Sequence, residues 1–377
     1  MSKLKYPELK VKSITLFYLR IPLKTSFTIS TGTQKFIDSV LVKIDADDLE
    51  GWGEAPSFTS PIYHYETAKT IMHIIKDYLA EMIVGESVNP YEARLKMESI
   101  RGHNFAKAAV EEALWDLTAK LFSLPLYKLL GGCRKEVPIN AAIGIQKSID
   151  ELLRKISSDL EKNYRQIKVK VKKNWDLSII STIRKEFGDV ELMVDANGHY
   201  SLSDIHHLKK FDLYNLNMIE QPLSYDDIID HASLQANMNT PICLDESIRS
   251  AEDARKAIMI GACRIINIKP PRVGGIISAK AIHDVAKASG IGVWCGGHIE
   301  TGVGQGHKIA IATLPNFIYP NDIEPSDRYL LEDIVDPPVT LSKRGTVEVL
   351  EKPGIGYEVN LQLMKKYLVK TIKINPP

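Results

Sequence analysis

The sequence has almost no net charge and no long apolar run. Its 48 Lys and Arg residues nearly equal its 47 Asp and Glu residues, so the formal net charge is only +1. Nucleic-acid binding normally shows as a strong basic excess, and a membrane helix needs roughly 18 consecutive apolar residues. We therefore expect a soluble chain that binds neither nucleic acid nor a membrane.

Cysteines are few and widely separated. The four are Cys133, Cys243, Cys263 and Cys295, and none of them forms a CxxC pair. This distribution argues against a disulfide framework and against a zinc site. The first residues, MSKLKYPELKVKSI, also lack the apolar core and cleavage site of a secretory signal. We therefore expect reduced, mostly buried thiols in a cytoplasmic protein.

The length of 377 residues is too great for one minimal domain. Residues 11–55 alternate as strands do, and three stretches that follow have apolar residues at helical spacing. The three stretches are 62–83, 90–100 and 104–122. We therefore expect an α+β capping domain over residues 1–130, with an antiparallel sheet followed by helices.

From residue 131 to 325, short apolar runs alternate with amphipathic helices. The eight runs are 137–145, 166–172, 190–197, 216–222, 241–247, 264–270, 291–297 and 316–323. This alternation predicts a parallel sheet closed into a modified (β/α) barrel of the TIM type. The stretch GTVEVLEKPGIGYEVN is strand-like again, so residues 326–377 are expected to pack back on the capping domain. The fold class is thus α/β, a barrel with an α+β cap.

Five charged residues occupy equivalent places in consecutive barrel runs. Counting from Lys170, the residues Asp195, Glu220 and Asp245 follow at intervals of 25, and Lys269 follows after 24. All five lie near the carboxyl ends of their runs, where barrel enzymes place their active sites. Buried charges at such places must pair with one another or with a metal. The spacing therefore predicts one charged active site at the barrel mouth.

The three carboxylates of this series form an all-oxygen ligand set. Such a set suits Mg²⁺ better than zinc, with Mn²⁺ as a substitute. Asn197 should face the same side of its strand as Asp195 and contact the substrate. Gln221 and Glu246 adjoin Glu220 and Asp245, and we expect them to support these ligands. Isolated carboxylates at strand ends would instead be surface residues or helix caps, but a constant interval argues against that alternative.

The lysines have the placement of catalytic bases. In QIKVKVK, strand alternation puts Lys168 and Lys170 on one face and the apolar residues on the other, toward the helices. Two neighbouring ammonium groups should lower the pKa of a lysine toward a useful value for a base. Lys269 should lie across the mouth. The pair can then remove a proton and return it on opposite faces of a carbon atom.

Two loops are expected to complete the site. Residues 24–34, KTSFTISTGTQ, contain a glycine and many small polar residues, which favours a mobile lid, assisted by Tyr63, although a loop without function has similar composition. The run GGHIETGVGQG follows the seventh strand and brings backbone N–H groups near the mouth. These groups can bind a distal carboxylate or succinyl group. The glycines do not fit a dinucleotide fingerprint.

The motifs KVK, VDAN, IEQP, LDES and NIKPPRVGG resemble the enolase superfamily, specifically its muconate-lactonizing branch. Sites in this superfamily use a Lys or His base with one or two Mg²⁺ ions. KKNWD, VWCGGHIETGVGQGH, LPNFIYPND and PGIGYEVN are similar to the group of o-succinylbenzoate synthases and N-succinylamino-acid racemases. The resemblance covers almost the whole chain.

The resemblance implies a role for each mouth residue. Asp195, Glu220 and Asp245 would bind Mg²⁺. Lys170 would be the base, Lys269 its partner on the opposite face and Lys168 the neighbouring lysine. The implied reactions are syn dehydration of a succinyl-hydroxycyclohexadiene carboxylate in menaquinone biosynthesis, which is a lyase reaction, and racemisation of N-succinylamino acids. Related barrels are commonly oligomeric, so a homo-oligomer is expected by analogy.

The chain departs from the group's pattern in two places. The group usually has Met where His298 stands, and Arg-Ala-His-Asn where this chain has 305–308, Gln-Gly-His-Lys. Gly297 and His298 are therefore expected substrate contacts, and the preferred substrate side chain stays open.

Other activities fit parts of this pattern. A dipeptide epimerase typically carries Asp-x-Asp after strand eight, where this chain reads Asn-Asp-Ile-Glu over 321–324. An enzyme like muconate cycloisomerase shares the same superfamily scaffold. A Schiff-base aldolase would use a barrel lysine without a metal. A non-catalytic barrel would not need the paired lysines and carboxylates.

Overall fold

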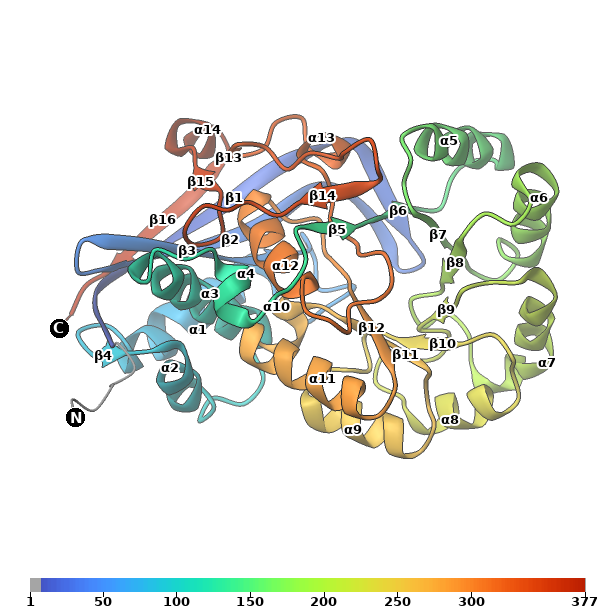
Figure 1. The fold of residues 1–377 in the computed structure, drawn as a ribbon, viewed down its shortest axis with the longest axis horizontal. Helices are drawn as coiled ribbons and strands as arrows, with labels where there is room; N and C mark the ends of the chain where they lie inside the picture. Colours follow the sequence, from blue (N-terminus) through green and yellow to red (C-terminus); the bar gives the residue numbers. More distant parts are fainter. Residues whose placement is uncertain (1–7, 377) are drawn as a thin grey trace.

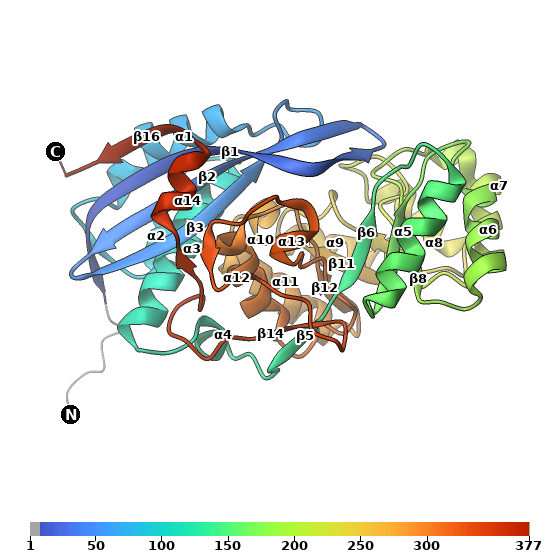
Figure 2. The same ribbon diagram turned by 90° about the horizontal axis from the view of Figure 1, so that it is seen from above.

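The computed structural model describes residues 8–376. The first seven residues, part of the segment in which we expect no secretory signal, lie outside this range. Figures 1 and 2 show an antiparallel sheet with its helices beside a larger region of strands and helices. The capping sheet has the strand order β16-β1-β2-β3, and β4 pairs with β1. These strands are Leu368–Ile374 (β16), Leu9–Ile29 (β1), Gly32–Ala46 (β2), Leu49–Ser57 (β3) and Ser87–Val88 (β4).

Helix α3 packs tightly on strand β3. A side chain at Gly51 or Gly53 would place its Cβ 2.2 Å from the Ala113 carbonyl oxygen or 2.0 Å from the Ala109 carbonyl oxygen. Glycine is therefore required on the strand, because only its bare backbone lets the helix approach so closely. The helical segments of this part are Ala68–Ile74 (α1), Ile75–Leu79 (η1), Ala80–Met82 (η2), Pro90–Met97 (α2), Asn104–Leu121 (α3) and Leu126–Leu130 (α4).

The barrel sheet contains seven parallel strands in the order β12-β11-β10-β9-β8-β7-β6. They are Asn140–Ile143 (β6), Gln166–Lys170 (β7), Leu192–Asp195 (β8), Ile219–Glu220 (β9), Ile242–Leu244 (β10), Ile265–Ile268 (β11) and Gly292–Cys295 (β12). The parallel alternation of strands and helices confirms the predicted α/β class. All seven strands lie within the runs expected from the sequence.

The prediction of an eighth strand over residues 316–323 is wrong. Residues 316–323 form no strand, but they make single parallel bridges, Val293 with Phe317 and Ile139 with Asn321. Pro320 has no N–H to offer, which interrupts any continuous ladder. The Asn321 side chain compensates, since its Oδ1 accepts from the Cys295 N–H at 2.7 Å and its Nδ2 donates to the Pro138 carbonyl at 3.1 Å. This segment therefore links β12 to the chain entering β6.

The helices outside the barrel sheet follow their strands. They are Ile149–Glu161 (α5), Leu177–Phe187 (α6), Ile205–Leu208 (α7), Ile229–Ala236 (α8), Ala251–Met259 (α9), Pro270–Val273 (α10), Ile276–Ala288 (α11) and Gly302–Ala312 (α12). The stretch 201–211 is not one helix. The short α7 lies between two 3₁₀ segments, Leu202–Asp204 (η3) and Lys209–Tyr214 (η4).

The last fifty residues run from the barrel back to the capping sheet, as Figure 1 shows in red. Strand β14 pairs with β5, β13 pairs with β15, and β16 joins the edge of β1. The remaining elements are Glu136–Pro138 (β5), Ser326–Tyr329 (α13), Val335–Asp336 (β13), Thr346–Glu348 (β14), Glu358–Val359 (β15) and Leu361–Lys366 (α14).

The expected lid over residues 24–34 is a β-hairpin tip rather than an irregular loop. Phe27 pairs with Gln34, Thr28 with Thr33, and Ile29 with Gly32, and the register shifts between Pro22 and Phe27. The two threonine hydroxyls lie 2.9 Å apart and hydrogen-bond across the hairpin. β-Branched and aromatic residues at alternate positions favour this extended pairing over a loop.

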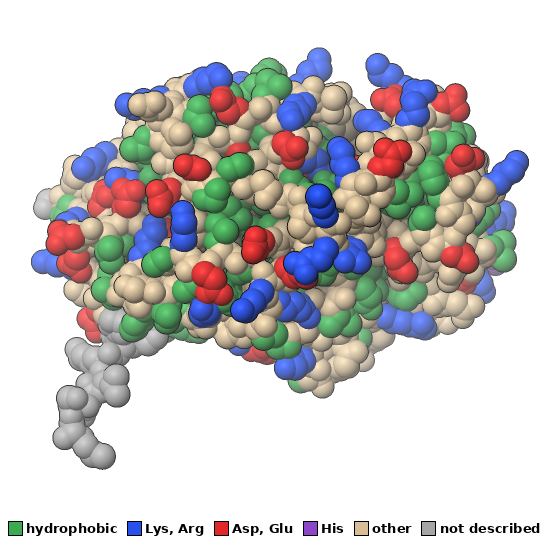
Figure 3. Space-filling model, turned by 45° about the horizontal axis from the view of Figure 1, so that its top comes forward, with side chains coloured by type: hydrophobic (Ala, Val, Ile, Leu, Met, Phe, Trp, Pro, Cys, Tyr) green, Lys and Arg blue, Asp and Glu red, His purple; other side chains and the backbone are tan. Residues whose placement is uncertain are grey.

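The surface carries both signs of charge. In Figure 3, Lys and Arg side chains are interspersed with Asp and Glu over the visible face. Within residues 8–376, no helix combines the length and apolarity that crossing a membrane demands. All four cysteines are free; Cys133 is exposed and the other three are buried.

Candidate active site

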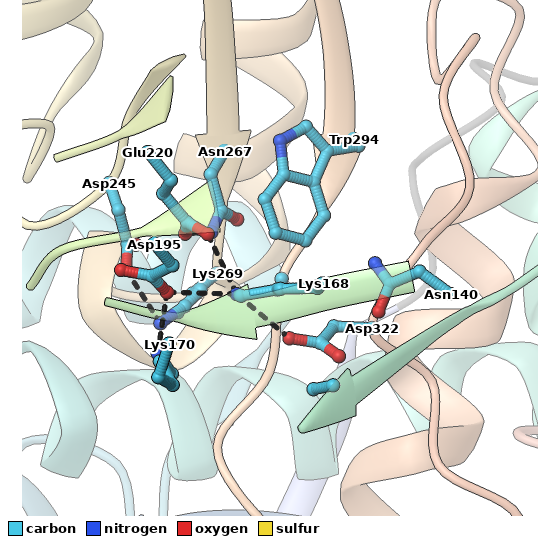
Figure 4. Close-up of polar contacts among 12 residues, drawn as sticks. Asn140, Lys168, Lys170, Asp195, Glu220, Asp245, Asn267, Lys269, Trp294 and Asp322 are labelled. Atoms are coloured by element: carbon cyan, nitrogen blue, oxygen red, sulfur yellow. Dashed lines mark hydrogen bonds and ion pairs between the residues drawn. The ribbon is translucent and has the colours of Figure 1, made fainter. Parts of the chain in front are cut away.

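The barrel strands bring the predicted charges side by side. Lys170 ends β7, Asp195 ends β8 and Glu220 ends β9, and the register pairs Lys170 with Asp195 and Asp195 with Glu220. Asp245 and Lys269 each follow the last residue of their strands, β10 and β11. Figure 4 shows these five side chains meeting at one place. The 25-residue spacing therefore corresponds to equivalent strand ends.

Lys168 lies at the centre of this cluster. Its Nζ is 2.7 Å from Glu220 Oε2, 3.1 Å from Asp195 Oδ2 and 3.2 Å from Asp322 Oδ2. It also stands over the Trp294 ring, 4.8 Å from its centroid. Burial by itself lowers the pKa of Lys168, but the charges of Glu220, Asp322 and Asp195 raise it well above the ordinary value. The expected lowering by a neighbouring lysine is therefore wrong for Lys168, because carboxylates outnumber ammonium groups around it.

Lys170 is held by two oxygen atoms. Its Nζ donates to Asp195 Oδ2 at 2.5 Å and to Asn197 Oδ1 at 2.9 Å. The Asn197 amide in turn donates to Glu246 Oε1 at 2.9 Å. Asn197 has a φ of 44°, a left-handed conformation that Asn tolerates better than most residues. Asn197 and Glu246 thus fix the position of Lys170, and neither is among the residues that line the cavity described below.

Lys269 is held from the other side of the cluster. Its Nζ donates to Asp245 Oδ2 at 2.8 Å and to the Tyr63 hydroxyl at 2.9 Å. Arg272 also forms an ion pair with Asp245. Burial disfavours the ammonium form, but Tyr63 and Glu246 outweigh this effect and raise the pKa of Lys269. Tyr63 comes from the capping domain, so both domains contribute to the site.

Gln221 supports the strand ends. Its Oε1 accepts from the Asp245 N–H at 3.0 Å and the Ser247 N–H at 3.3 Å, and its Nε2 donates to Ser247 Oγ at 2.6 Å. It has a φ of 37°, which turns its backbone away from the strand direction. The side chain therefore fixes the backbone that carries Asp245.

Sequence reasoning missed three polar residues of the cluster. Asn267 donates to Glu220 Oε1 at 2.6 Å, Asp322 pairs with Lys168, and Arg272 pairs with Asp245. Strand alternation offers a signal for Asn267, since it precedes Lys269 by two residues and shares its face. Arg272 lies one helical turn after Lys269, in α10. Asp322 had no such signal, because its run forms no strand.

The three carboxylates have the chemistry of a divalent metal site. All are buried, they come from three adjacent strands, and Glu220 Oε2 and Asp245 Oδ1 have only the ion-paired Lys168 and Arg272 as partners. A lysine ammonium group is ion-paired with each of the three carboxylates. With the side chains in these positions, no group of three Asp, Glu, His or Cys side chains within residues 8–376 is close enough together to hold a metal. Burial and the charge of Asp195 raise the pKa of Glu220, which reflects repulsion that a cation would relieve. The donor set therefore fits Mg²⁺.

Gly297 and His298 line a small cavity of about 50 Å³ over the lysines. The other lining residues include Phe27, Ile29 and Gln34 of the hairpin tip, Phe58, Tyr63, the three lysines, Asp322 and Glu324. A larger cavity of about 690 Å³ lies outside it, between α5, the hairpin tip and residues 338–341. Phe27 and Ala142 line both cavities, so the hairpin tip separates the outer cavity from the charged cluster.

Both parts of the chain match known protein families. Residues 12–131 match the mandelate racemase / muconate lactonizing enzyme N-terminal domain, and residues 151–363 match the enolase C-terminal domain-like family. An o-succinylbenzoate synthase of Geobacillus kaustophilus is 45% identical over 95% of this chain and 96% of its own length. An N-succinylamino acid racemase of Thermus thermophilus is 39% identical over 95% of this chain and 97% of its own.

A solved enolase-superfamily structure from Listeria innocua has a TM-score of 0.94 and 37% identity, covering 97% of this chain and 99% of that one. These findings confirm the resemblance to the o-succinylbenzoate synthase and N-succinylamino acid racemase group. Sites of this kind generally depend on Mg²⁺. Two matching domains, close relatives along nearly the whole chain and a common fold therefore place this protein in the enolase superfamily.

Proposed function

We propose that this chain is a Mg²⁺-dependent o-succinylbenzoate synthase that also racemises N-succinylamino acids. The observation that carries the proposal is the placement of Lys170 and Lys269, which reach one carboxylate cluster from β7 and from the end of β11, with three strands between them. A substrate carbon between two such amines can exchange a proton on either face. The close relatives support the choice of substrate class.

The reaction begins with proton removal next to a carboxylate. Mg²⁺, bound by Asp195, Glu220 and Asp245, would supply the positive charge that holds this carboxylate and stabilises the negative charge developing on it. Lys170, as the neutral amine, takes the α-proton while Asn197 keeps its Nζ in place. The electron pair of the broken C–H bond passes to the substrate carboxylate.

The second step separates the two activities. In dehydration, the electron pair forms the new ring double bond, and the β-hydroxyl takes the proton that Lys170 has just accepted and leaves as water, while Lys269 stays an ammonium group. In racemisation, Lys269 donates its proton to the same carbon on the opposite face. The Tyr63 hydroxyl, 2.9 Å from Lys269 Nζ, keeps that amine oriented.

The two parts of the chain have separate tasks in this proposal. Residues 131–325 carry the charged groups, and residues 1–130 with 326–377 close the mouth. Phe27, Ile29 and Gln34 of the hairpin tip and Tyr63 supply the closing wall. A wall that narrows the mouth limits the access of water and strengthens the electrostatic interactions inside.

A Schiff-base aldolase is the competing activity from another class. That reaction uses a lysine that attacks a carbonyl carbon and needs no metal. The three buried carboxylates around the mouth lysines have no role in such a reaction, whereas they are the metal ligands of the proposed one. Trapping with borohydride in the presence of EDTA would support the aldolase.

The test uses Mg²⁺-loaded protein in D₂O, with the succinyl-hydroxycyclohexadiene carboxylate and, separately, with N-succinylamino acids. We expect aromatic product from the first substrate and α-deuterium in both enantiomers of the second. Mn²⁺ should replace Mg²⁺ in both assays. Neither product nor deuterium exchange would overturn the proposal.

A further inference from the structure

His298 has an unusual environment for a buried histidine. It is only 8% exposed, and neither ring nitrogen has a hydrogen-bond partner within residues 8–376. A buried polar atom without a partner costs free energy, so a native structure normally supplies one. The ring lines the same cavity as Lys168, Lys170 and Lys269. The missing partner can therefore come from a bound substrate.

The surroundings of the ring indicate which nitrogen carries the proton. Its faces and edges pack against Tyr63 and Phe105, with ring centroids 5.7 and 5.0 Å away. Nδ1 faces Glu300 Oε1 at 3.8 Å. Burial lowers the pKa of His298 to about 4, so the ring is neutral near pH 7 and carries one N–H. The nearby carboxylate favours that proton on Nδ1, which leaves a lone pair on Nε2.

Glu300 is itself fixed in place. The His298 backbone N–H donates to Glu300 Oε1 at 3.2 Å, and Lys308 Nζ donates to Oε2 at 2.8 Å. Lys308 is only 1% exposed, and its ammonium lies so close to Gly297 that a Cβ there would be 2.2 Å away. The chain Lys308, Glu300, His298 therefore orients the imidazole from behind the cavity wall.

The same network contains two further residues that depart from the group's pattern, Gln305 and Lys308. Gln305 Nε2 donates to Glu324 Oε2 at 2.8 Å, and Lys308 Nζ lies 3.7 Å from the same oxygen atom. Glu324 lines the cavity beside His298. The unusual residues at 298, 305 and 308 are thus parts of one buried polar cluster at one wall of the substrate cavity.

We propose that His298 selects substrates whose variable part, the side chain or the acyl group, presents a hydroxyl or amide N–H to Nε2. This inference rests on the proposed function, because it concerns the substrate bound at that site. An apolar group against Nε2 leaves the nitrogen unpaired, whereas a donor of the same shape pairs it. A site built to hydrogen-bond a substrate group rejects the analogue that lacks it.

The test compares substrate pairs of equal shape by α-deuterium exchange. The side-chain arm uses N-succinyl-Asn against N-succinyl-Leu and N-succinyl-Thr against N-succinyl-Val. The acyl arm uses N-succinamoyl-Val against N-succinyl-Val. In His298→Met, we expect the preference for the donor-bearing member, measured as the ratio of kcat/KM, to fall about tenfold or more in one arm. The arm that changes identifies the part of the substrate that His298 contacts.

Two further variants make the result specific. His298→Gln keeps an acceptor near the position of Nε2 and should retain most of the preference. His206→Met makes the same replacement at an exposed histidine outside the cavity and should leave the ratios unchanged. Exchange in the wild type with ratios unaffected by His298→Met would overturn the role of His298 while leaving the proposed function intact. Absence of exchange with every substrate would overturn both.

Discussion

The molecule buries carboxylates in two regions, and their partners differ in kind. At the barrel mouth, Asp195, Glu220 and Asp245 face lysine and arginine side chains. At the contact between the capping domain and the barrel, Glu54 and Glu111 face backbone N–H groups at the starts of helices, and Arg94 lies 4.0 Å from Glu111. Side-chain cations can move aside for a metal and a substrate, whereas a helix N-terminus cannot. The first arrangement therefore suits chemistry and the second suits assembly.

Of the two carboxylates at the domain contact, Glu54 accepts more hydrogen bonds than Glu111. Glu54, on β3, accepts from the Gly304 N–H at 2.8 Å, the Thr301 N–H at 3.0 Å, the Thr301 hydroxyl at 2.6 Å and Ser39 Oγ at 2.7 Å. Glu111, on α3, accepts from the Ile277 N–H at 2.8 Å at the start of α11. Unpaired N–H groups and the helix dipole favour a carboxylate at these positions. The capping domain is thus held to α11 and α12 by two buried side chains.

Removal of the metal should have the largest effect at the mouth and none at the domain contact. Chelation with EDTA should reduce dehydration and racemisation roughly 10³-fold, because the metal is worth several kcal/mol in the transition state. Added Mg²⁺ should restore both activities. Far-UV circular dichroism should not change, since Glu54 and Glu111 bind backbone groups rather than metal. Full turnover in EDTA would contradict the assignment of the carboxylates.

Lys170→Ala should reduce both activities by about 10² to 10⁴-fold, the usual contribution of a general base. The folded state should survive, because the carboxylate left behind can still bind metal. Lys173→Ala is the matched control, an exposed lysine three residues along the chain that pairs only with Asp204 in the ion pairs of the described residues. Activity of Lys170→Ala within tenfold of the wild type would exclude Lys170 as the base.

These two regions also differ in how far the sequence predicts them. The mouth residues repeat at the period of the strands, and parallel register carries that period directly into space, so Lys170, Asp195 and Glu220 could be placed from spacing alone. Glu54 meets Thr301 across 247 residues through a backbone N–H, which has no residue-type signal. The direction of the Lys168 pKa shift is unpredictable for a related reason. Asp322 lies on an interrupted strand, so its approach to Lys168 Nζ has no signal in the sequence.

Glu54→Ala should test the domain contact. It leaves the Thr301 and Gly304 N–H groups and the Ser39 hydroxyl without their acceptor, and the free energy of unfolding should fall by about 3 kcal/mol. Glu50→Ala on the same strand removes an exposed ion pair and the hydrogen bond from Trp52 Nε1, and should cost only about 1 kcal/mol. Urea unfolding measures both. Turnover per folded molecule should stay within a few-fold of the wild type, in contrast to Lys170→Ala.

The domain contact should also respond to pH in a defined direction. Burial raises the pKa of Glu54 from 4.5 to about 7, so the folded state holds the proton more tightly than the unfolded state. The stability contributed by this proton is fully present below pH 4.5 and is lost as pH rises to 7, by about 3 kcal/mol for a shift of this size. The unfolding free energy of the wild type minus that of Glu54→Gln should therefore decrease across this range. An increase of this difference with pH would mean that the helix N-terminus lowers the pKa of Glu54 by more than burial raises it.

Tyr63→Phe should give the smallest effect on rate, and this effect should differ between racemisation and dehydration. The change removes the hydroxyl that lies 2.9 Å from Lys269 Nζ and 3.2 Å from Asp245 Oδ2, but keeps the ring that packs on Phe58 and His298. One such hydrogen bond is worth about 1 kcal/mol, or roughly fivefold in rate. Proton delivery by Lys269 should slow by this factor in racemisation, while dehydration, which needs only the positive charge, should change less. Tyr65→Phe on the same loop alters an exposed ring and should change neither reaction. Equal slowing of both reactions by Tyr63→Phe would show that Tyr63 positions the substrate rather than Lys269.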